Sequence, residues 1–305
     1  MSHLILKFEE KWATHPDCEM IIQTSWEADV LPGSPMARLF EKIKRCRFAL
    51  LDWSRATFGH SQTQLKEKEQ RLEELCQLNN ADHVNTIKEL KGEISTLIHQ
   101  EELAWRQRSR SIWLPAGDKN TKYFHQRASQ CRRKNQILGV LDSEGNWCTS
   151  EDRIAQVAES YFQNLFTSAH SNNIGNVLRT VERRITPQMN DNLTQRYTME
   201  EVRFALFQMH PSKSPGPDGM SPFFFQKYWH IVGTDVTDAV LSVLHSGHML
   251  RKMNHTHIVL IPKKKDPKCM GDYRPISLGN VVSRLLSKVI ANRLKHVLPN
   301  IISKS

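Results

Sequence analysis

Thr256-His-Ile-Val-Leu-Ile-Pro262 and Tyr273-Arg-Pro-Ile-Ser-Leu278 enclose the lysine-rich tract Lys263-Lys-Lys-Asp-Pro-Lys268. The first segment is a β-branched apolar run that ends at a proline, and the proline of the second limits it to a sheet edge or strand end. The pattern predicts a β-hairpin with lysines at its tip. Lys263 and Arg274 flank that tip, where two cations could hold a phosphate. Lysines also protect an open strand edge from aggregation, so the residues alone leave both interpretations open.

Helical periodicity dominates the remainder of the chain. Thr198 and Glu201 form a capping box, and Gly247 occupies the position of a helix-ending glycine. Residues 137–147 contain Gly145 in a turn and predict a second short hairpin. The segments with apolar residues at helical spacing are 62–98, 154–165, 202–209, 236–244 and 285–297. We therefore expect a mainly α fold with small β-hairpins (α+β).

Composition narrows the functional classes. The 305 residues allow about two domains. The charge of +10, from 42 basic and 32 acidic residues, favours an anionic partner, nucleic acid before membrane. The sequence has no run apolar enough to cross a bilayer and no signal sequence at its start, so we expect no membrane partner and an intracellular, non-secreted protein.

The distribution of cysteine and histidine argues against a metal site. The six cysteines stand singly, without the paired spacing of zinc ribbons or disulfide scaffolds. The pairs His245/His248 and His255/His257 have no third and fourth ligand at a suitable spacing. We therefore expect neither a metal nor another cofactor in this chain.

Residues 101–134 carry nine of the basic residues against three acids. Aromatic residues, among them Trp113 and Tyr123, are interleaved with these cations, a pattern typical of binding to nucleic acid by charge and stacking. A solvated helix face is the alternative. The candidate nucleic-acid-binding residues are Lys122, Arg127, Arg132, Arg133 and Lys134.

Residues 211–222 contain four prolines and two glycines and predict an irregular loop with restricted backbone angles. Asp218 precedes Gly219. An aspartate in this position commonly hydrogen-bonds to its own backbone, so Asp218 is interpreted as a turn-stabilising residue rather than an acid catalyst.

Four blocks of the sequence occur in an order and spacing that resemble a known family. They are Pro211-Ser-Lys-Ser-Pro-Gly-Pro-Asp-Gly219, Leu260-Ile-Pro-Lys263, Asp272-Tyr-Arg-Pro-Ile-Ser-Leu278 and Ser287-Lys-Val-Ile-Ala-Asn-Arg-Leu294. Together they resemble the start of the reverse transcriptase domain, an RNA-directed DNA polymerase, of LINE-type non-LTR retrotransposons. Upstream, Phe8–Trp12, Trp26, Trp113 and Gly117–His125 resemble the region that joins the endonuclease to the polymerase in those transposable elements.

The resemblance implies roles for particular residues. A template-facing loop of an N-terminal extension would contain Lys213, Gly216, Asp218 and Gly219. Lys263 and Arg274 would lie near the triphosphate of the incoming nucleotide, in the fingers.

The resemblance also implies a domain organisation. Residues 1–60 would be the tail of an upstream region, 61–148 a helical hairpin and basic linker with a short β-hairpin, and 149–305 the N-terminal extension and fingers, truncated before the palm. We expect helices packed round the 256–278 hairpin, and exposed apolar surface on 281–298 where the palm would lie.

The expected function is that of a partial reverse transcriptase. Polymerisation needs palm aspartates that hold two Mg²⁺ ions, and the chain has no Asp-Asp pair. The complete parent enzyme would use Mg²⁺, an RNA template and a DNA primer, together with palm and thumb segments, in a nuclear or cytoplasmic ribonucleoprotein. This fragment would bind nucleic acid and nucleotide triphosphate without catalysis. The alternatives are a non-catalytic basic nucleic-acid-binding protein and, less favoured, a scaffold built on the 62–105 helices.

Overall fold

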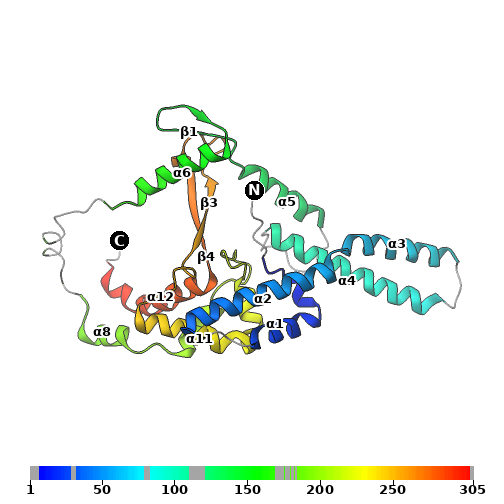
Figure 1. Cartoon of the computed structure of the whole chain (residues 1–305), viewed down its shortest axis with the longest axis horizontal. Helices are drawn as coiled ribbons and strands as arrows, with labels where there is room; N and C mark the ends of the chain where they lie inside the picture. Colours follow the sequence, from blue (N-terminus) through cyan, green and yellow to red (C-terminus); the bar gives the residue numbers. More distant parts are fainter. Residues whose placement is uncertain are drawn as a thin grey trace.

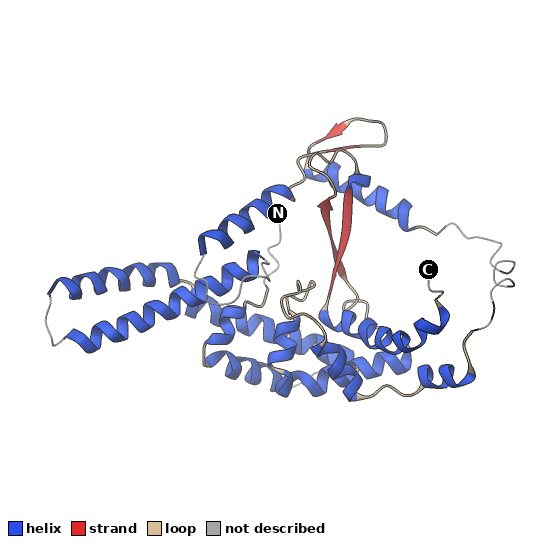
Figure 2. Cartoon of the chain, turned by 180° about the vertical axis from the view of Figure 1, so that it is seen from behind, coloured by secondary structure: helices blue, strands red, loops and turns tan. Residues whose placement is uncertain are grey.

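Helices make up most of the structure, and two small antiparallel sheets complete it (Figure 1; Figure 2). The computed structural model describes residues 7–28, 32–78, 83–109, 121–168 and 184–302, with the single residues 175, 179 and 182. The expected mainly α fold with small β-hairpins is confirmed. Trp113 and the turn at 115–120 lie outside the described residues.

The elements of the first half are η1 (Glu10–Thr14), α1 (Asp17–Glu27), α2 (Pro35–Phe58), α3 (Ser61–Leu78), α4 (Val84–Ser109), α5 (Thr121–Lys134), β1 (Val140–Leu141) and β2 (Trp147–Cys148). Those of the second half are α6 (Glu151–Phe166), α8 (Pro187–Thr194), α9 (Met199–Phe207), α10 (Pro222–Lys227), α11 (Trp229–Ser246), β3 (Thr256–Pro262), η3 (Met270–Asp272), β4 (Tyr273–Gly279) and α12 (Val281–Ile301).

Local sequence signals mark the starts, ends and turns of these elements at the predicted positions. The Thr198 hydroxyl accepts from the backbone N–H of Glu201, and the Glu201 carboxylate accepts from that of Thr198, which completes the capping box of α9. Gly247 ends α11 with φ +73°, and Gly145 turns the β1–β2 hairpin with φ +86°. Glycine adopts such positive φ angles without the steric cost that other residues incur.

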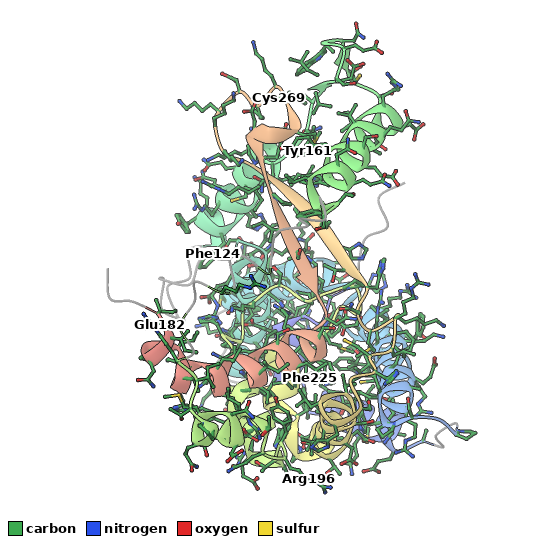
Figure 3. The ribbon with its side chains drawn as sticks, turned by 90° about the vertical axis from the view of Figure 1, so that its left-hand side faces the viewer. Phe124, Tyr161, Glu182, Arg196, Phe225 and Cys269 are labelled. Atoms are coloured by element: carbon green, nitrogen blue, oxygen red, sulfur yellow. The ribbon has the colours of Figure 1, made fainter. Side chains whose placement is uncertain are left out.

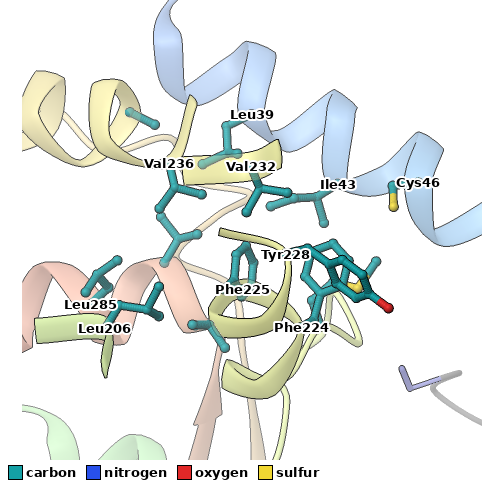
Figure 4. Close-up of a cluster of buried hydrophobic side chains, with 14 of the residues drawn as sticks. Leu39, Ile43, Cys46, Leu206, Phe224, Phe225, Tyr228, Val232, Val236 and Leu285 are labelled. Atoms are coloured by element: carbon teal, nitrogen blue, oxygen red, sulfur yellow. The ribbon is translucent and has the colours of Figure 1, made fainter. Parts of the chain in front are cut away.

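The main core joins the two ends of the chain (Figure 4). Apolar residues of η1, α1 and α2 pack against residues of α9 to α12, including Leu39 against the region of Val232 and Val236. Asp235 of α11 strengthens this contact, because it accepts from the Trp26 indole at 2.8 Å and the Lys42 ammonium at 2.7 Å. This core therefore contains residues from both the 1–60 and the 149–305 segments, and the proposed three-part division of the chain stays a prediction.

Helices α3 and α4 form a hairpin that extends away from this core (Figure 1; Figure 2). Leu75, Leu90 and Ile94 are buried between the two helices. The carboxyl end of α4 returns to the main body, where the Gln107 side chain donates to the carbonyl of Phe8 at 2.9 Å. The predicted helical hairpin is confirmed, and one of its ends is fixed to the N-terminal segment.

The β3–β4 hairpin stands between the helical body and a smaller cluster formed by β1, β2 and α6 (Figure 1). The buried residues of this second core are Val140, Cys148, Phe162, Met270 and Tyr273. The expectation that helices pack round the hairpin is wrong, since Ile258, Val259 and Ile276 remain exposed on the ribbon. The aromatic N-terminal helices supply the packing partners of the C-terminal helices instead.

The apolar surface expected on residues 281–298 is present only in part, because Val281, Leu285 and Val289 are buried. Ile290, Leu294 and Leu298 recur every four residues on α12, and each is about 40% exposed. Residues spaced by four lie on one helix face, so they form a continuous apolar stripe. Within the described ranges, no helix combines the length and the apolarity that a bilayer crossing requires.

Candidate nucleotide and nucleic-acid interface

The register of the β3–β4 hairpin places its two flanking cations on one face. Ile261 pairs with Arg274, and the ladder continues one step further through the bond from the Lys263 N–H to the Asp272 carbonyl at 2.8 Å. Alternate residues of a strand point to the same side, so Lys263, Asp272 and Arg274 share a face with Ile261. Lys263 and Arg274 are both exposed.

The tip of this hairpin is an ordered turn built round one carboxylate. Asp272 accepts from the backbone N–H of Lys268 at 2.9 Å, that of Cys269 at 3.2 Å and the Lys264 ammonium at 2.9 Å. These donors, the Lys268 N–H foremost, hold the pKa of Asp272 far below its usual range, and the bond to Asp272 raises the pKa of Lys264. Among the described residues, Asp272 forms its ion pair with Lys264 and not with Lys263 or Arg274.

The tip is also attached to the second core (Figure 3). The Leu141 N–H donates to the Lys268 carbonyl at 2.7 Å, and Met270 and Tyr273 are almost fully buried. The Lys263 ammonium donates to the carbonyl of Gly271 at 2.7 Å. The hairpin therefore presents its cations from a fixed position rather than from a solvated loop.

Residues 211–222, which we name the proline-glycine loop, are held by close backbone contact with the start of α12. A Cβ atom on Gly216 would lie far inside 3.0 Å of the Asn280 nitrogen, so only glycine fits there. The Asn280 side chain accepts from the Asp218 N–H at 3.1 Å and donates to the Met253 carbonyl at 3.0 Å. Gly219 has φ +77°, and its carbonyl accepts from the Phe8 N–H at 2.9 Å.

Asp218 has the predicted turn-stabilising contact. One of its carboxylate oxygens accepts from the Met220 N–H at 3.0 Å, two residues further along. Burial raises the pKa of Asp218 to about 7, opposed by that hydrogen bond and by the charges of Arg284 and Arg47. Gly216, Asp218 and Gly219 are all buried, whereas Lys213 is exposed.

Lys213 lies on a groove of about 900 Å³, which we name the Lys213 groove. Its walls come from η1, α2, the end of α4 and the proline-glycine loop. Basic residues outnumber acidic ones along it: Lys7, Lys11, Arg55, Arg108 and Lys213 against Glu9. Glu9 pairs with Lys11 and Arg108, which leaves a net excess of positive charge, and a concave surface with such an excess attracts polyanions such as a nucleic-acid backbone.

Helix α5 carries the five basic residues selected from the sequence. Phe124 is buried against the rest of the structure (Figure 3), and the His125 ring lies 3.5 Å from that of Trp105 on α4. The five exposed cations flank this packed face and, within the described part of the chain, none of them forms an ion pair. They are Lys122, Arg127, Arg132, Arg133 and Lys134.

Sequence reasoning missed the residues that fasten the proline-glycine loop. Arg47 of α2 donates to the Pro217 carbonyl at 3.4 Å, and Arg284 of α12 donates to the Ser214 carbonyl at 2.9 Å. Asn280, immediately before α12, has the position of a helix cap, but its side chain bonds to the loop instead. No local pattern in the sequence predicts these contacts, because they join residues 62 or more positions apart.

Comparison with known proteins places the chain among transposon proteins. It is 28% identical over 196 residues to the uncharacterized 149 kDa protein of transposon TX1 from Xenopus laevis, a match that covers 64% of this chain and 15% of that protein. It is 33% identical over 84 residues to the retrovirus-related Pol polyprotein from the type-2 retrotransposable element R2DM of Drosophila melanogaster. That match covers 27% of this chain and 8% of the polyprotein.

No protein-family model matches the chain. The aligned regions represent a small part of both relatives, and the identities are modest. Both relatives are nevertheless proteins of transposable elements, as the four sequence blocks indicate for this chain. The chain is therefore similar to proteins of transposable elements, and this similarity supports the resemblance to reverse transcriptases of non-LTR retrotransposons.

Proposed function

We propose that this chain corresponds to the N-terminal extension and fingers of a non-LTR retrotransposon reverse transcriptase, in which Lys263 and Arg274 contact the triphosphate of an incoming nucleotide. The observation that carries the proposal is the shared, exposed face of these two cations on a hairpin whose tip is fixed. Charge-assisted bonds from Lys and Arg are a common means of binding phosphate.

The template would contact the Lys213 groove. Because Gly216, Asp218 and Gly219 are buried, their part in a template-facing loop would be to set the backbone path, and direct contact would come from Lys213. The cations of α5 would add sequence-independent contacts to phosphates of the RNA template or DNA primer. The partners are therefore nucleic acids, with palm and thumb segments in the parent enzyme.

Within the parent enzyme, catalysis would depend on Mg²⁺ held by palm aspartates, and this segment would bind without catalysing. Two-metal phosphoryl transfer needs carboxylates that converge on a pair of ions. No two aspartates after residue 201 are adjacent in the sequence, and Asp218 and Asp272 already serve as turn acceptors.

Protection from lysine acylation tests the triphosphate contact on the full chain. A deoxynucleoside triphosphate with Mg²⁺ should slow the labelling of Lys263, measured by mass spectrometry, while labelling of the exposed Lys91 on α4 serves as the internal control. Substitution Arg274→Gln should weaken this protection. Equal labelling of Lys263 with and without the triphosphate would overturn the proposed contact.

The exposed cations of α5 favour a second candidate, a non-catalytic nucleic-acid-binding protein. A triple variant (Lys122→Gln, Arg127→Gln, Arg133→Gln) should weaken RNA binding and reduce the slope of log affinity against log salt by roughly one for each phosphate that is no longer bound. RNA binding with this salt dependence, together with no triphosphate protection of Lys263, would favour this second candidate.

A further inference from the structure

A cavity of about 580 Å³ opens between α2, the proline-glycine loop and the segment that links α11 to β3. We name it the Phe48 cavity, and it lies apart from the hairpin tip. Its size falls within the usual range for small-ligand sites. The apolar part of its lining comes from Phe40, Ile43, Phe48 and Pro217.

The outer lining of the cavity is cationic. Lys44, Arg251, Lys252 and His255 all line it and are exposed, and the Lys252 ammonium lies 5.9 Å from the centre of the Phe40 ring. The carboxylate that lines the cavity, Asp218, is only 9% exposed, so the rim is mainly cationic even though Lys44 also pairs with Glu41 at 3.8 Å. A rim of this kind favours an anionic occupant.

The deep end of the cavity contains polar groups of a different kind. Asp218 and Asn280 are buried there, beside the buried side chain of Ile43. One oxygen of Asp218 accepts from Met220, while the Asp218 Oδ2 and the Arg47 Nε are buried without a hydrogen-bond partner among the described residues. Asp218 and Asn280 both line the cavity, so its deep end is polar and suits an occupant with a polar edge.

The exposed aromatic ring of Phe48 also lines the Phe48 cavity. Phe48 is 54% exposed although it belongs to a well-packed helix, and its neighbours Cys46 and Leu50 are fully buried. An exposed ring beside cations is the usual arrangement for stacking a base while its phosphate is held. A lipid chain would match the apolar wall but offer no polar group to the deep end, and an acidic peptide would match the rim but offer no flat ring to stack on Phe48.

We infer that the Phe48 cavity binds one unpaired nucleotide of a single-stranded nucleic acid, with the base against Phe48 and Phe40, its polar edge toward Asp218, and the phosphates at the rim of Lys44, Arg251 and Lys252. This inference rests on the proposed nucleic-acid binding but not on the triphosphate contact at the hairpin. It adds a site that recognises an unpaired base to the backbone contacts of the Lys213 groove and α5.

The test compares two exposed phenylalanines in the full chain. Phe48→Ala should weaken binding of a single-stranded RNA by about fivefold or more, the usual effect of removing one base–aromatic stack. Binding of a blunt RNA duplex should be unchanged. Phe204→Ala, at a residue 61% exposed on α9, is the matched control and should leave both affinities unchanged.

A second measurement locates the contact. Single-stranded RNA that contains 4-thiouridine should crosslink to the α2 peptide that includes Phe48, and Lys252→Gln should reduce the yield more than Lys91→Gln does. Equal single-strand affinity for Phe48→Ala and Phe204→Ala would overturn the inference, as would binding of an acidic peptide that competes at this cavity. Failure of the wild-type chain to bind any RNA would instead overturn the proposed function.

Discussion

Substitution of Gly216 by alanine should destabilise the protein strongly, because the added methyl group has no space at the start of α12. The new Cβ would lie 2.5 Å from the Gly279 carbonyl carbon and 2.6 Å from the Asn280 Oδ1, and closer still to the Asn280 nitrogen. Two of these atoms belong to the backbone and cannot rotate away. The loop must therefore move by about half an ångström, because real Cβ contacts essentially never fall below 3.0 Å.

That movement has an energetic cost that can be calculated from the contacts. Overpacking costs about 1–3 kcal/mol, and weakening the bond from the Asp218 N–H to Asn280 adds about 0.5–1.5 kcal/mol. We expect a total loss of about 2–4 kcal/mol in the free energy of unfolding, and a fall in melting temperature of roughly 5–15 °C. Thermal unfolding followed by circular dichroism measures both quantities.

Gly92→Ala is the matched control. Gly92 lies inside α4, and an added Cβ there would have no atom within 4 Å. Alanine should therefore stabilise this helix by about 1 kcal/mol, through propensity alone. If Gly216→Ala and the wild type melt at the same temperature, the close approach of the loop to α12 is not a real constraint, and the reasoning about this loop is refuted.

Three further substitutions test other parts of the structure. Phe224→Ala should lower the free energy of unfolding in urea by about 3–5 kcal/mol, since the ring is fully buried in the main core; a loss below about 1 kcal/mol would contradict that burial. Glu201→Gln should cost about 1 kcal/mol at pH 7, because the bond to Arg293 lowers the pKa of Glu201. This stability is present above the unfolded pKa of about 4.3 and is lost as pH falls through the lower folded value, so the melting difference should vanish in acid; a constant difference would contradict the ion pair. Asp272→Asn should speed alkylation of Cys269 at pH 8, since Asp272 raises the pKa of that thiol, and an unchanged rate relative to the exposed Cys76 would contradict the contact.

Local signals in the sequence predicted the secondary structure well. The capping box at Thr198, the left-handed Gly247 and the turn at Gly145 depend on neighbouring residues only, so each could be recognised without the fold. The β3–β4 pairing was also predictable, because two apolar strands enclose a short polar tip.

Long-range packing could not be predicted in the same way. The apolar faces of α1 and α2 show that they are buried, but not that their partners lie about 200 residues away on α10 and α11. The same distinction between local signals and long-range packing applies to the candidate site. The shared face of Lys263 and Arg274 follows from strand alternation, whereas the burial of Asp218 depends on Asn280 and Arg47, which no local pattern connects to it.

The β3–β4 ribbon touches a different core at each end. Its base continues through Gly279 and Asn280 into α12, and its tip contributes Met270 and Tyr273 to the smaller cluster. The ribbon therefore joins the α6 cluster to the start of α12 through one hydrogen-bonded ladder. It also connects the cations at its tip with Asn280 at its base, whose side chain holds the proline-glycine loop.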